Sequence, residues 1–281
     1  MLTATDHRRD RLGLNYIYPV VSRRAGGLSI GINLNTNNAC NWRCIYCQVP
    51  GLWRGKAPDV DLQTLAHELN SVLTDILQGD FCSRYQLPAA SDSLREIAIS
   101  GNGEPTNSGV FAQVVELIGS TAGEFGLLNK IKIVLITNGS QIYRPSVKNG
   151  ITRLSQINGE VWFKFDSATT AGLRSINNTG VPVARLRRNL ETAAKLCPTW
   201  IQTCVFALDG RPPAVAAQEL YLQFISSLME NRIPLKGILL YGIARPSQQP
   251  EASRLTRLPA DWLAQYAARL RSTGIEVKVS V

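Results

Sequence analysis

Short apolar runs alternate with helical patterns along most of this 281-residue chain, and this alternation is its strongest structural constraint. Strands joined by helices favour a parallel sheet, because a parallel pair needs a long crossover connection. Repeated units of this kind predict a closed or partial barrel or a doubly wound sheet. The expected strands are residues 28–35, 95–101, 130–139, 160–167, 199–210 and 234–244.

We therefore expect an α/β fold, a partial (β/α)6 barrel with parallel strands and a cysteine-bearing loop after the first strand. Asp61 and Pro145 stand where two outer helices should begin. We expect one domain in three parts: an irregular N-terminal extension over 1–27, a core over 28–245, and a helix and strand over 246–281 packed on the core. Apolar periodicity predicts helices at 61–77, 108–120, 182–196, 213–230 and 259–274.

Polar or glycine-containing loops follow each expected strand. In parallel α/β folds, ligands and catalytic groups gather at the carboxyl ends of the strands. We therefore expect one functional rim. Its loops are the three-cysteine segment 39–51 and residues 101–106, 137–140, 167, 209–210 and 245–246.

The formal net charge of +9 is compatible with an anionic partner such as RNA, and equally with a solvated basic surface. Residues 1–18 lack the apolar region of a signal peptide. No stretch reaches the roughly 18 apolar residues that a membrane helix needs. We expect a cytoplasmic protein that makes no membrane contact and keeps its six cysteines as free thiols or metal ligands.

Three of these cysteines, Cys40, Cys44 and Cys47, fall within eight positions. A structural zinc site normally takes four protein ligands, and the nearest further cysteine is Cys82. Three separate packing thiols are a second interpretation, but these cysteines crowd into a loop rich in asparagine. The third interpretation is an iron–sulfur cluster held by three thiolates, which leaves one iron open to a ligand.

The spacing C-x3-C-x2-C, with Tyr46 before the last cysteine, resembles the signature of the radical S-adenosylmethionine (radical SAM) superfamily. The resemblance implies that Cys40, Cys44 and Cys47 bind a 4Fe–4S cluster whose fourth iron takes the amine and carboxylate of SAM. It also implies that an electron from the cluster cleaves SAM to methionine and a 5′-deoxyadenosyl radical. Tyr46 is expected near the cofactor.

The segment ISGNGEPT ends the second expected strand and resembles the family's Gly-Gly-Glu-Pro stretch, whose backbone holds the amino group of SAM. Glycine lets backbone groups approach a ligand closely. Asn102 stands where many members have the first glycine, whereas Gly103 and Glu104 match the pattern. The variant looks like the branch of Fe–S oxidoreductases that includes wyosine-base-forming enzymes. The resemblance therefore places Gly101, Asn102, Gly103 and Glu104 at the cofactor.

Two further strand ends resemble the family. In LITNG, Thr137 and Asn138 are placed to reach the cofactor, although a plain Asn-Gly turn has the same sequence. In FKFDS, Lys164 and Asp166 should share one strand face. Many relatives carry Ser-Leu-Asp here and use the first position on the SAM carboxylate or ribose. Lys164 replaces that serine and could pair with the carboxylate as a cation.

The last two core strands add further candidates. Gln202 and Cys204 share a face of the fifth strand. We expect Gln202 among the cofactor contacts, and Cys204 is either a hydrogen-atom donor or a core thiol. On the sixth strand, Tyr241 is either core or lumen-facing, and Arg245 could clamp a carboxylate or form a surface ion pair. No side chain is assigned as the catalytic residue.

The resemblance covers residues 28–245 and implies an enzyme that uses a 4Fe–4S cluster and SAM to abstract hydrogen from a substrate. It also implies an electron donor such as flavodoxin or ferredoxin. The open substrate classes are an RNA base, a peptide or small anionic metabolite, and a glycyl-radical enzyme awaiting activation. A non-enzymatic iron–sulfur or zinc module is the alternative from a different class. An enclosed barrel would shield a radical from water.

Overall fold

A curled sheet of eight strands forms the centre of the molecule. The structure, a computed structural model, describes residues 12–22, 24–88 and 92–280. Strand β1 (Ile17–Ser22) pairs antiparallel with β2 (Gly27–Ile32), and every other neighbouring pair in this sheet is parallel. The order is β1-β2-β5-β6-β7-β8-β10-β12. The later strands are β5 (Leu94–Ile99), β6 (Lys132–Thr137), β7 (Gly159–Lys164), β8 (Thr199–Val205), β10 (Leu235–Gly242) and β12 (Val277–Ser280).

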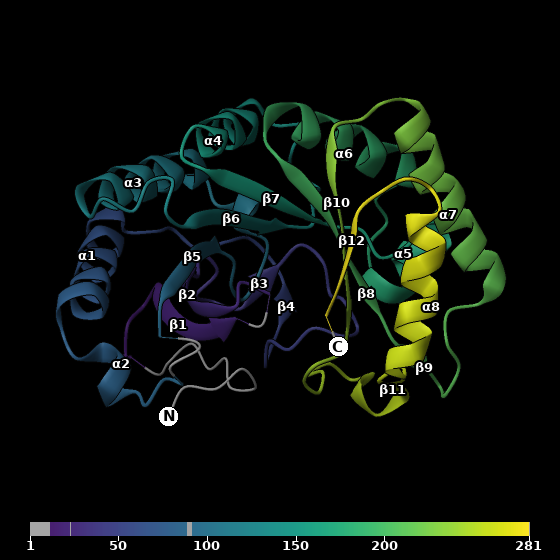
Figure 1. The fold of residues 1–281 in the computed structure, drawn as a ribbon, viewed down its shortest axis with the longest axis horizontal. Coiled ribbons are helices and arrows are strands. Elements are labelled where there is room, and N and C mark those ends of the chain that lie inside the picture. The colour runs from purple at the N-terminus through teal and green to yellow at the C-terminus, as the bar shows by residue number, and fades with distance from the viewer. Residues whose placement is uncertain (1–11, 23, 89–91, 281) are drawn as a thin grey trace.

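Helices lie in an arc outside the curled sheet (Figure 1). They connect successive parallel strands, as the alternation in the sequence predicted. The sheet does not close, because β1 and β12 remain as its two edges. The prediction of an α/β partial barrel is therefore confirmed. The helices are α1 (Leu62–Gln78), α2 (Phe81–Arg84), α3 (Phe111–Glu124), α4 (Pro145–Ser155), α5 (Thr170–Asn177), α6 (Val183–Leu196), α7 (Val215–Glu230) and α8 (Ala260–Arg271).

Two helices begin where their sequences predict. The side chain of Asp61 accepts hydrogen bonds from the backbone N–H groups of Gln63 and Thr64, so it caps α1. Pro145 is the first residue of α4, where its missing N–H costs no helical hydrogen bond. The apolar faces of these helices then pack on the sheet, and Leu65 of α1 is fully buried.

Alternation along the strands separates an outer core from the lumen. On β5, Ile97 and Ile99 are fully buried in the main core under the helices, while Glu96 and Ala98 face inward and line a cavity. A second apolar cluster lies on the inner face of the sheet, where Ala98 packs with Val134, Trp162, Trp200 and Leu239. The lumen is therefore a partly filled interior with a bounded cavity.

The structure differs from the sequence-based expectation near the N-terminus. Strand β1 lies inside the segment 1–27 that was predicted to be irregular, and residues 1–11 of that segment lie outside the described residues. Pro19 interrupts the usual strand composition of β1, but an edge strand tolerates proline because one side of it carries no partner. The three-part division of the chain stays a prediction.

Four short strands form two small pairs beside the main sheet. Strands β3 (Ala39–Cys40) and β4 (Trp53–Arg54) are parallel, and β9 (Ala207–Leu208) and β11 (Leu255–Thr256) are antiparallel. Short 3-10 turns cover Pro105–Asn107 and Ala252–Arg254.

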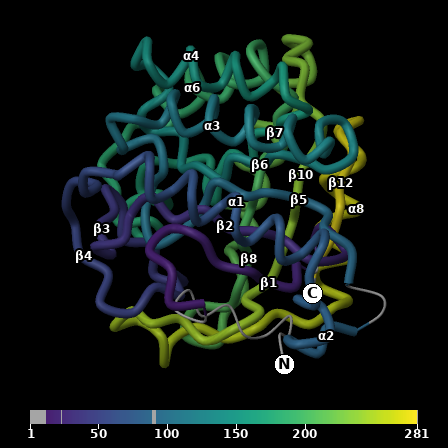
Figure 2. The backbone as a smooth tube through the Cα atoms, turned by 90° about the vertical axis from the view of Figure 1, so that its left-hand side faces the viewer, coloured from purple at the N-terminus to yellow at the C-terminus, as the bar shows by residue number. Residues whose placement is uncertain are grey.

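The chain after β10 returns to the three-cysteine loop. Figure 2 shows β3 and β4 at one side of the molecule, with the late, yellow-green part of the chain passing below them. We call residues 247–251 the strap, because they contact that loop directly. Among the described residues, we find no helix that combines the length and the hydropathy of a membrane span.

Candidate functional site

A cavity of about 850 Å³ opens inside the curled sheet. Loops from neighbouring parallel strands meet there, as a functional rim at their carboxyl ends predicts. Three further candidates, Cys204, Tyr241 and Arg245, also line it. The predicted site residues on its wall are Cys40, Cys44, Cys47, Tyr46, the segment 101–104, Asn138, Lys164 and Gln202.

The three thiols of the loop are free cysteines that face this one cavity. Burial raises the pKa of Cys40 to about 12 and the pKa of Cys44 to about 11. Lys164 partly offsets the effect at Cys44, because its positive charge favours the thiolate. Burial therefore favours the thiol over the thiolate at both residues, and a metal would bind by displacing their protons.

The arrangement of the thiols bears on the kind of metal group they fit. In the described part of the chain, no group of three or more His, Cys, Asp or Glu side chains is placed to hold a single metal ion. A cube of four irons and four sulfides offers a different iron to each thiolate, so its ligands need not meet at one atom. Three thiols on the wall of one cavity, with space beside them, fit such a cube.

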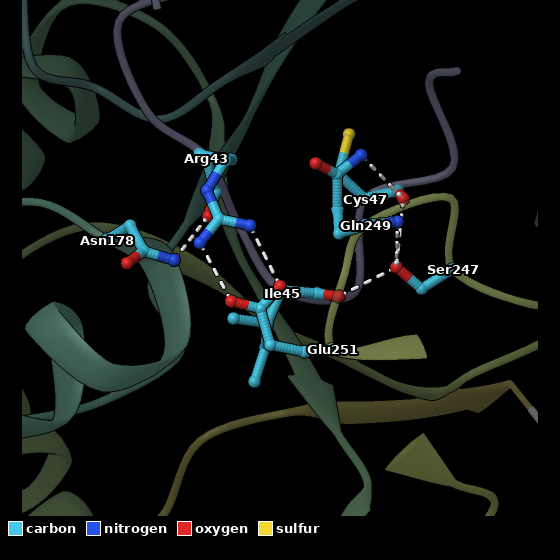
Figure 3. Close-up of polar contacts among 7 residues, drawn as sticks. All are labelled: Arg43, Ile45, Cys47, Asn178, Ser247, Gln249 and Glu251. Atoms are coloured by element: carbon cyan, nitrogen blue, oxygen red, sulfur yellow. Dashed lines mark hydrogen bonds and ion pairs between the residues drawn. The ribbon is translucent and has the colours of Figure 1, made fainter. Parts of the chain in front are cut away.

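The strap holds the three-cysteine loop through hydrogen bonds to the loop's backbone carbonyl groups. The Ser247 hydroxyl donates to the carbonyl oxygens of Ile45, at 2.7 Å, and Cys47, at 3.1 Å. The backbone N–H of Gln248 and the side-chain amide of Gln249 also donate to the Cys47 carbonyl, at 2.9 and 3.4 Å. Figure 3 shows the Cys47 sulfur pointing away from these contacts. The strap therefore holds the loop without occupying the thiol.

A second set of contacts fixes the loop around Arg43. Its guanidinium donates twice to the carboxylate of Glu251 in the strap, at 2.8 and 2.7 Å (Figure 3). Its carbonyl accepts from Asn178 Nδ2 at 2.8 Å, just after α5. The backbone N–H of Ile45 donates to the carbonyl of Ile176 at 2.8 Å. Both flanks of Cys44 are therefore tied to distant parts of the chain.

The glycines of the segment 101–104 permit close backbone packing. A Cβ on Gly103 would lie 2.1 Å from the carbonyl oxygen of Ala39, and one on Gly101 would lie 2.3 Å from Asn33 Oδ1. Neither contact is possible for a larger residue without moving the loop, because real Cβ atoms do not approach so closely. Gly103 thus lets the segment lie against Ala39, the residue before Cys40, and Gly101 lets it lie against Asn33 at the end of β2.

Asn102, at the position where the radical SAM pattern usually has glycine, joins the same segment to the cysteine loop. Its Nδ2 donates to Asn38 Oδ1 at 2.6 Å, and its backbone N–H donates to Asn33 Oδ1 at 3.0 Å. The departure from the family pattern therefore adds a side-chain hydrogen bond at the edge of the cavity.

Glu104 links the ends of β5 and β6 from a buried position. Its carboxylate accepts from the hydroxyls of Thr106 and Thr137, both at 2.5 Å, and from the backbone N–H of Asn138 at 2.6 Å. Burial raises the pKa of Glu104, and these donors oppose the rise by stabilising the charged form. Thr137 is not among the residues that line the cavity. Its hydroxyl holds the Glu104 carboxylate in place, so any effect of Thr137 on a bound ligand passes through Glu104.

Lys164 presents a cation to the cavity. Its Nζ donates to the Tyr46 hydroxyl at 3.4 Å and lies 5.0 Å from the centre of that ring. Burial disfavours the ammonium, but Tyr241, Cys44 and Asp166 outweigh this and raise the pKa of Lys164. No ion pair in the described part of the chain includes it. Lys164 is therefore available to an anionic ligand.

Asp166 lies behind the cavity wall and accepts hydrogen bonds from three groups. Its Oδ2 accepts from the Tyr46 hydroxyl at 2.5 Å and from Asn177 Nδ2 at 2.7 Å, and its Oδ1 accepts from the backbone N–H of Cys204 at 2.9 Å. The carboxylate is absent from the cavity wall. Asp166 and Lys164 both contact the Tyr46 hydroxyl, as two side chains on one strand face should, and binding of the cofactor by Asp166 stays a prediction.

The other side of the cavity carries an amide and a thiol from β8. Gln202 is buried, and its Oε1 has no hydrogen-bond partner among the described residues. Cys204 is also buried, with Ile45, Tyr46 and Phe206 in one apolar cluster. Gln202 therefore has acceptor capacity left for a ligand in the cavity.

Sequence reasoning missed the residues that hold the loop: Arg43, Asn177, Ser247, Gln249 and Glu251. Each acts through a contact between segments far apart in the chain, and none stands in a recognisable local pattern. The only available signal was negative, since the polar strap sequence between β10 and α8 matched no expected helix or strand.

Comparison with known sequences gives a partial match. No protein-family model matches the chain. A segment of 134 residues, 47% of the chain, is 28% identical to the UPF0026 protein of Helicobacter pylori strain J99. The match covers 37% of that relative, so the chain spans little more than a third of its length.

Solved structures show the fold. TYW1 with a lysine–pyruvate adduct bound has a TM-score of 0.57 at 16% identity, covering 87% of this chain and 73% of its own. A radical SAM methyltransferase from Sphaerobacter thermophilus has a TM-score of 0.56 at 14% identity, covering 93% and 68%. Streptococcus suis SuiB bound to S-adenosylmethionine has a TM-score of 0.54 at 12% identity, covering 92% and 48%. The chain has the partial-barrel fold of the radical SAM enzymes.

Proposed function

We propose that this chain is a radical SAM enzyme that holds a 4Fe–4S cluster on Cys40, Cys44 and Cys47 and binds SAM beside it. The observation that carries the proposal is the convergence of three thiols and the segment 101–104 on one cavity. The shared fold supports it. When bound, the two cofactors supply a 5′-deoxyadenosyl radical that abstracts hydrogen from a substrate.

Different residues of the chain bind different groups of SAM. The backbone of the segment 101–104 receives the amino group, because Gly103 brings that backbone against the cysteine loop and Gly101 brings it against Asn33. Lys164 pairs with the carboxylate, since it is a half-buried cation on the cavity wall and forms no ion pair with a described carboxylate. Gln202 offers its unpaired Oε1 to a donor on the ligand.

The remaining space receives the substrate. Away from the cysteines, the cavity continues along the inner face past Ala98 and Ile136 to Ser29 and Glu96. The apolar cluster on that face excludes water from one side of it. Exclusion of water protects a reactive radical from side reactions, so the barrel interior suits hydrogen abstraction from a bound C–H group.

The net charge of +9 supports a polyanionic substrate, and an RNA base is the one we propose. Binding of an unmodified transfer RNA to the purified protein should weaken steeply between about 50 and 200 mM salt, because released counterions drive such complexes. Binding that is absent at low salt would exclude RNA and leave a peptide, a small anionic metabolite or a glycyl-radical enzyme. An electron donor such as flavodoxin or ferredoxin completes the proposal.

Anaerobic reconstitution tests the cofactor assignment. Wild-type protein should take up about four irons per chain and form 5′-deoxyadenosine from SAM when dithionite is added. Cys44→Ala should lose both properties. Cys82→Ala is the matched control, because that thiol is absent from the cavity wall, and it should keep both. A colourless wild-type protein that retains zinc and leaves SAM intact would overturn the proposal in favour of a zinc module.

A further inference from the structure

Asn177, the last residue of α5, places a side-chain N–H on a sulfur of the proposed cluster site. Its Nδ2 donates to Cys44 Sγ at 3.2 Å and to Asp166 Oδ2 at 2.7 Å. The residue is fully buried. One amide group, with two N–H bonds, thus bridges a thiol that faces the cavity and a carboxylate behind its wall.

The chemistry of the neighbours fixes which way this amide points. The oxygen and nitrogen of an asparagine side chain are easily interchanged in a structure, so the partners have to decide. A carboxylate only accepts hydrogen bonds, which places Nδ2 rather than Oδ1 toward Asp166. Oδ1 is buried and has no hydrogen-bond partner among the described residues. The Asn177 amide therefore directs both N–H bonds to Asp166 and Cys44, and its Oδ1 stays without a hydrogen bond from the described residues.

The rest of the network holds Asn177 in this orientation. Asp166 is itself fixed by the Tyr46 hydroxyl and the backbone N–H of Cys204. The carbonyl oxygen of Asn177 accepts from the backbone N–H of Arg43 at 3.2 Å, beside Cys44. Backbone and side chain of Asn177 therefore approach the Cys44 region together, and the network holds the Nδ2 donor beside the Cys44 sulfur.

We propose that Asn177 is a positioning residue whose N–H donates to the Cys44 thiolate and raises the reduction potential of the cluster. The inference rests on the proposed function. Reduction adds negative charge to an iron–sulfur cluster, and hydrogen bonds to its sulfurs are among the features that set its potential. A hydrogen-bond donor at Cys44 stabilises the reduced cluster more than the oxidised one, because the sulfur carries more negative charge in the reduced cluster. No equivalent side-chain amide is recorded on Cys47 within the described residues.

Redox titration followed by electron paramagnetic resonance (EPR) tests the inference on reconstituted protein. Asn177→Ala removes the donor, so the ratio of reduced to oxidised cluster at the wild-type midpoint should fall by about tenfold, within the range of outer-shell effects. For a one-electron couple, a tenfold change is about 59 mV. Asn177→Ser, which keeps a shorter donor, should lie between wild type and Asn177→Ala.

Asn178→Gly is the matched control for a purely structural effect. It removes the hydrogen bond to the Arg43 carbonyl but leaves the Cys44 sulfur untouched, and glycine suits the left-handed backbone at this position, where φ is 49°. It should lower iron retention without moving the midpoint. The same midpoint in Asn177→Ala and wild type would overturn the inference.

Other outcomes are also decisive. If both Asn177 variants fail to hold a cluster while Asn178→Gly holds one, Asn177 is needed for assembly and the tuning role is wrong. If wild-type protein itself takes up no cluster, the proposed function fails as a whole, and that result is distinct from an unchanged midpoint.

Discussion

Arg43 and Glu251 form a bidentate ion pair across 208 positions of sequence. Arg43 directly precedes Cys44, and Glu251 is the last residue of the strap. Their side chains are 28% and 19% exposed, so the pair is largely shielded from water. It fastens the middle of the three-cysteine loop to the segment that follows the last core strand of the barrel.

Breaking this pair should loosen the loop. Glu251→Gln keeps the shape of the side chain but removes its charge. In a double-mutant cycle with Arg43→Met, the coupling free energy should be about 1 kcal/mol, which is the upper range for partly exposed pairs. Urea denaturation measures it, and iron retention after exposure to a chelator should fall in the same variants.

The ion pair between Arg254 and Asp209 supplies the matched control. It is also bidentate, but its side chains are 51% and 55% exposed. Water screens such a pair, so Asp209→Asn should change the free energy of unfolding less than Glu251→Gln does. Equal effects at the two sites would mean that the strap contact has no special importance for the loop.

Acid should weaken the strap contact. The hydrogen bond from Arg43 holds the pKa of Glu251 below its ordinary value of 4.5. A carboxyl group with a lowered folded-state pKa stabilises the protein fully above its unfolded pKa, and this stability is lost as the pH falls through the folded value. The stability difference between wild type and Glu251→Gln, measured by denaturation from pH 7 to pH 3, should therefore shrink below about pH 4.5. A stability difference that stays constant with pH would show that the negative charge of Glu251 does not stabilise the folded protein.

Gly103 should not tolerate a methyl group. In Gly103→Ala the added Cβ would meet the Ala39 carbonyl oxygen at 2.1 Å, so the segment or the loop has to move. Overpacking of this kind costs about 1–3 kcal/mol in the free energy of unfolding. Gly109→Ala is the control, because nothing lies within 4 Å of its added Cβ. Similar unfolding curves for the two variants would contradict the close packing.

Glu104 should be sensitive to loss of its charge alone. In Glu104→Gln an amide NH₂ would face the hydroxyl and N–H donors around it, and an unsatisfied buried donor costs about 1–3 kcal/mol. Thermal unfolding should show a clear loss relative to Glu116→Gln, since Glu116 is exposed on α3. If the two variants unfolded at the same temperature, the network between β5 and β6 would have little energetic importance.

Local patterns in the sequence were sufficient for the fold. Short apolar runs predicted the parallel strands from β2 to β10, and Asp61 and Pro145 marked helix starts by their own chemistry. Strand β1 was missed because Pro19 is unusual in a strand, and because this edge strand is stabilised by its pairing with β2, which the sequence does not show. Helix α5 was missed because it covers only eight residues, and of these only Leu173 and Asn177 are buried.

The site residues that lie in a contiguous motif could be predicted from the sequence. Those that act through contacts between distant segments could not. The cysteines and the segment 101–104 each lie in one stretch, so their spacing was readable. Strand alternation placed Asp166 beside Lys164, but it could not predict the hydrogen bonds that the Asp166 carboxylate accepts from distant residues. The contact of Asn177 with Cys44 joins residues 133 positions apart, which no local pattern encodes.

The most direct test of the account is the EPR spectrum of the reduced, reconstituted protein before and after SAM is added. If Cys40, Cys44 and Cys47 hold the cluster as proposed, one iron has no protein ligand, so SAM should bind that iron and change the signal. Asn178→Gly and Cys82→Ala should respond in the same way, since neither alters the cavity wall. A reduced 4Fe–4S signal that SAM leaves unchanged would contradict the central claim that this chain keeps one iron open for SAM.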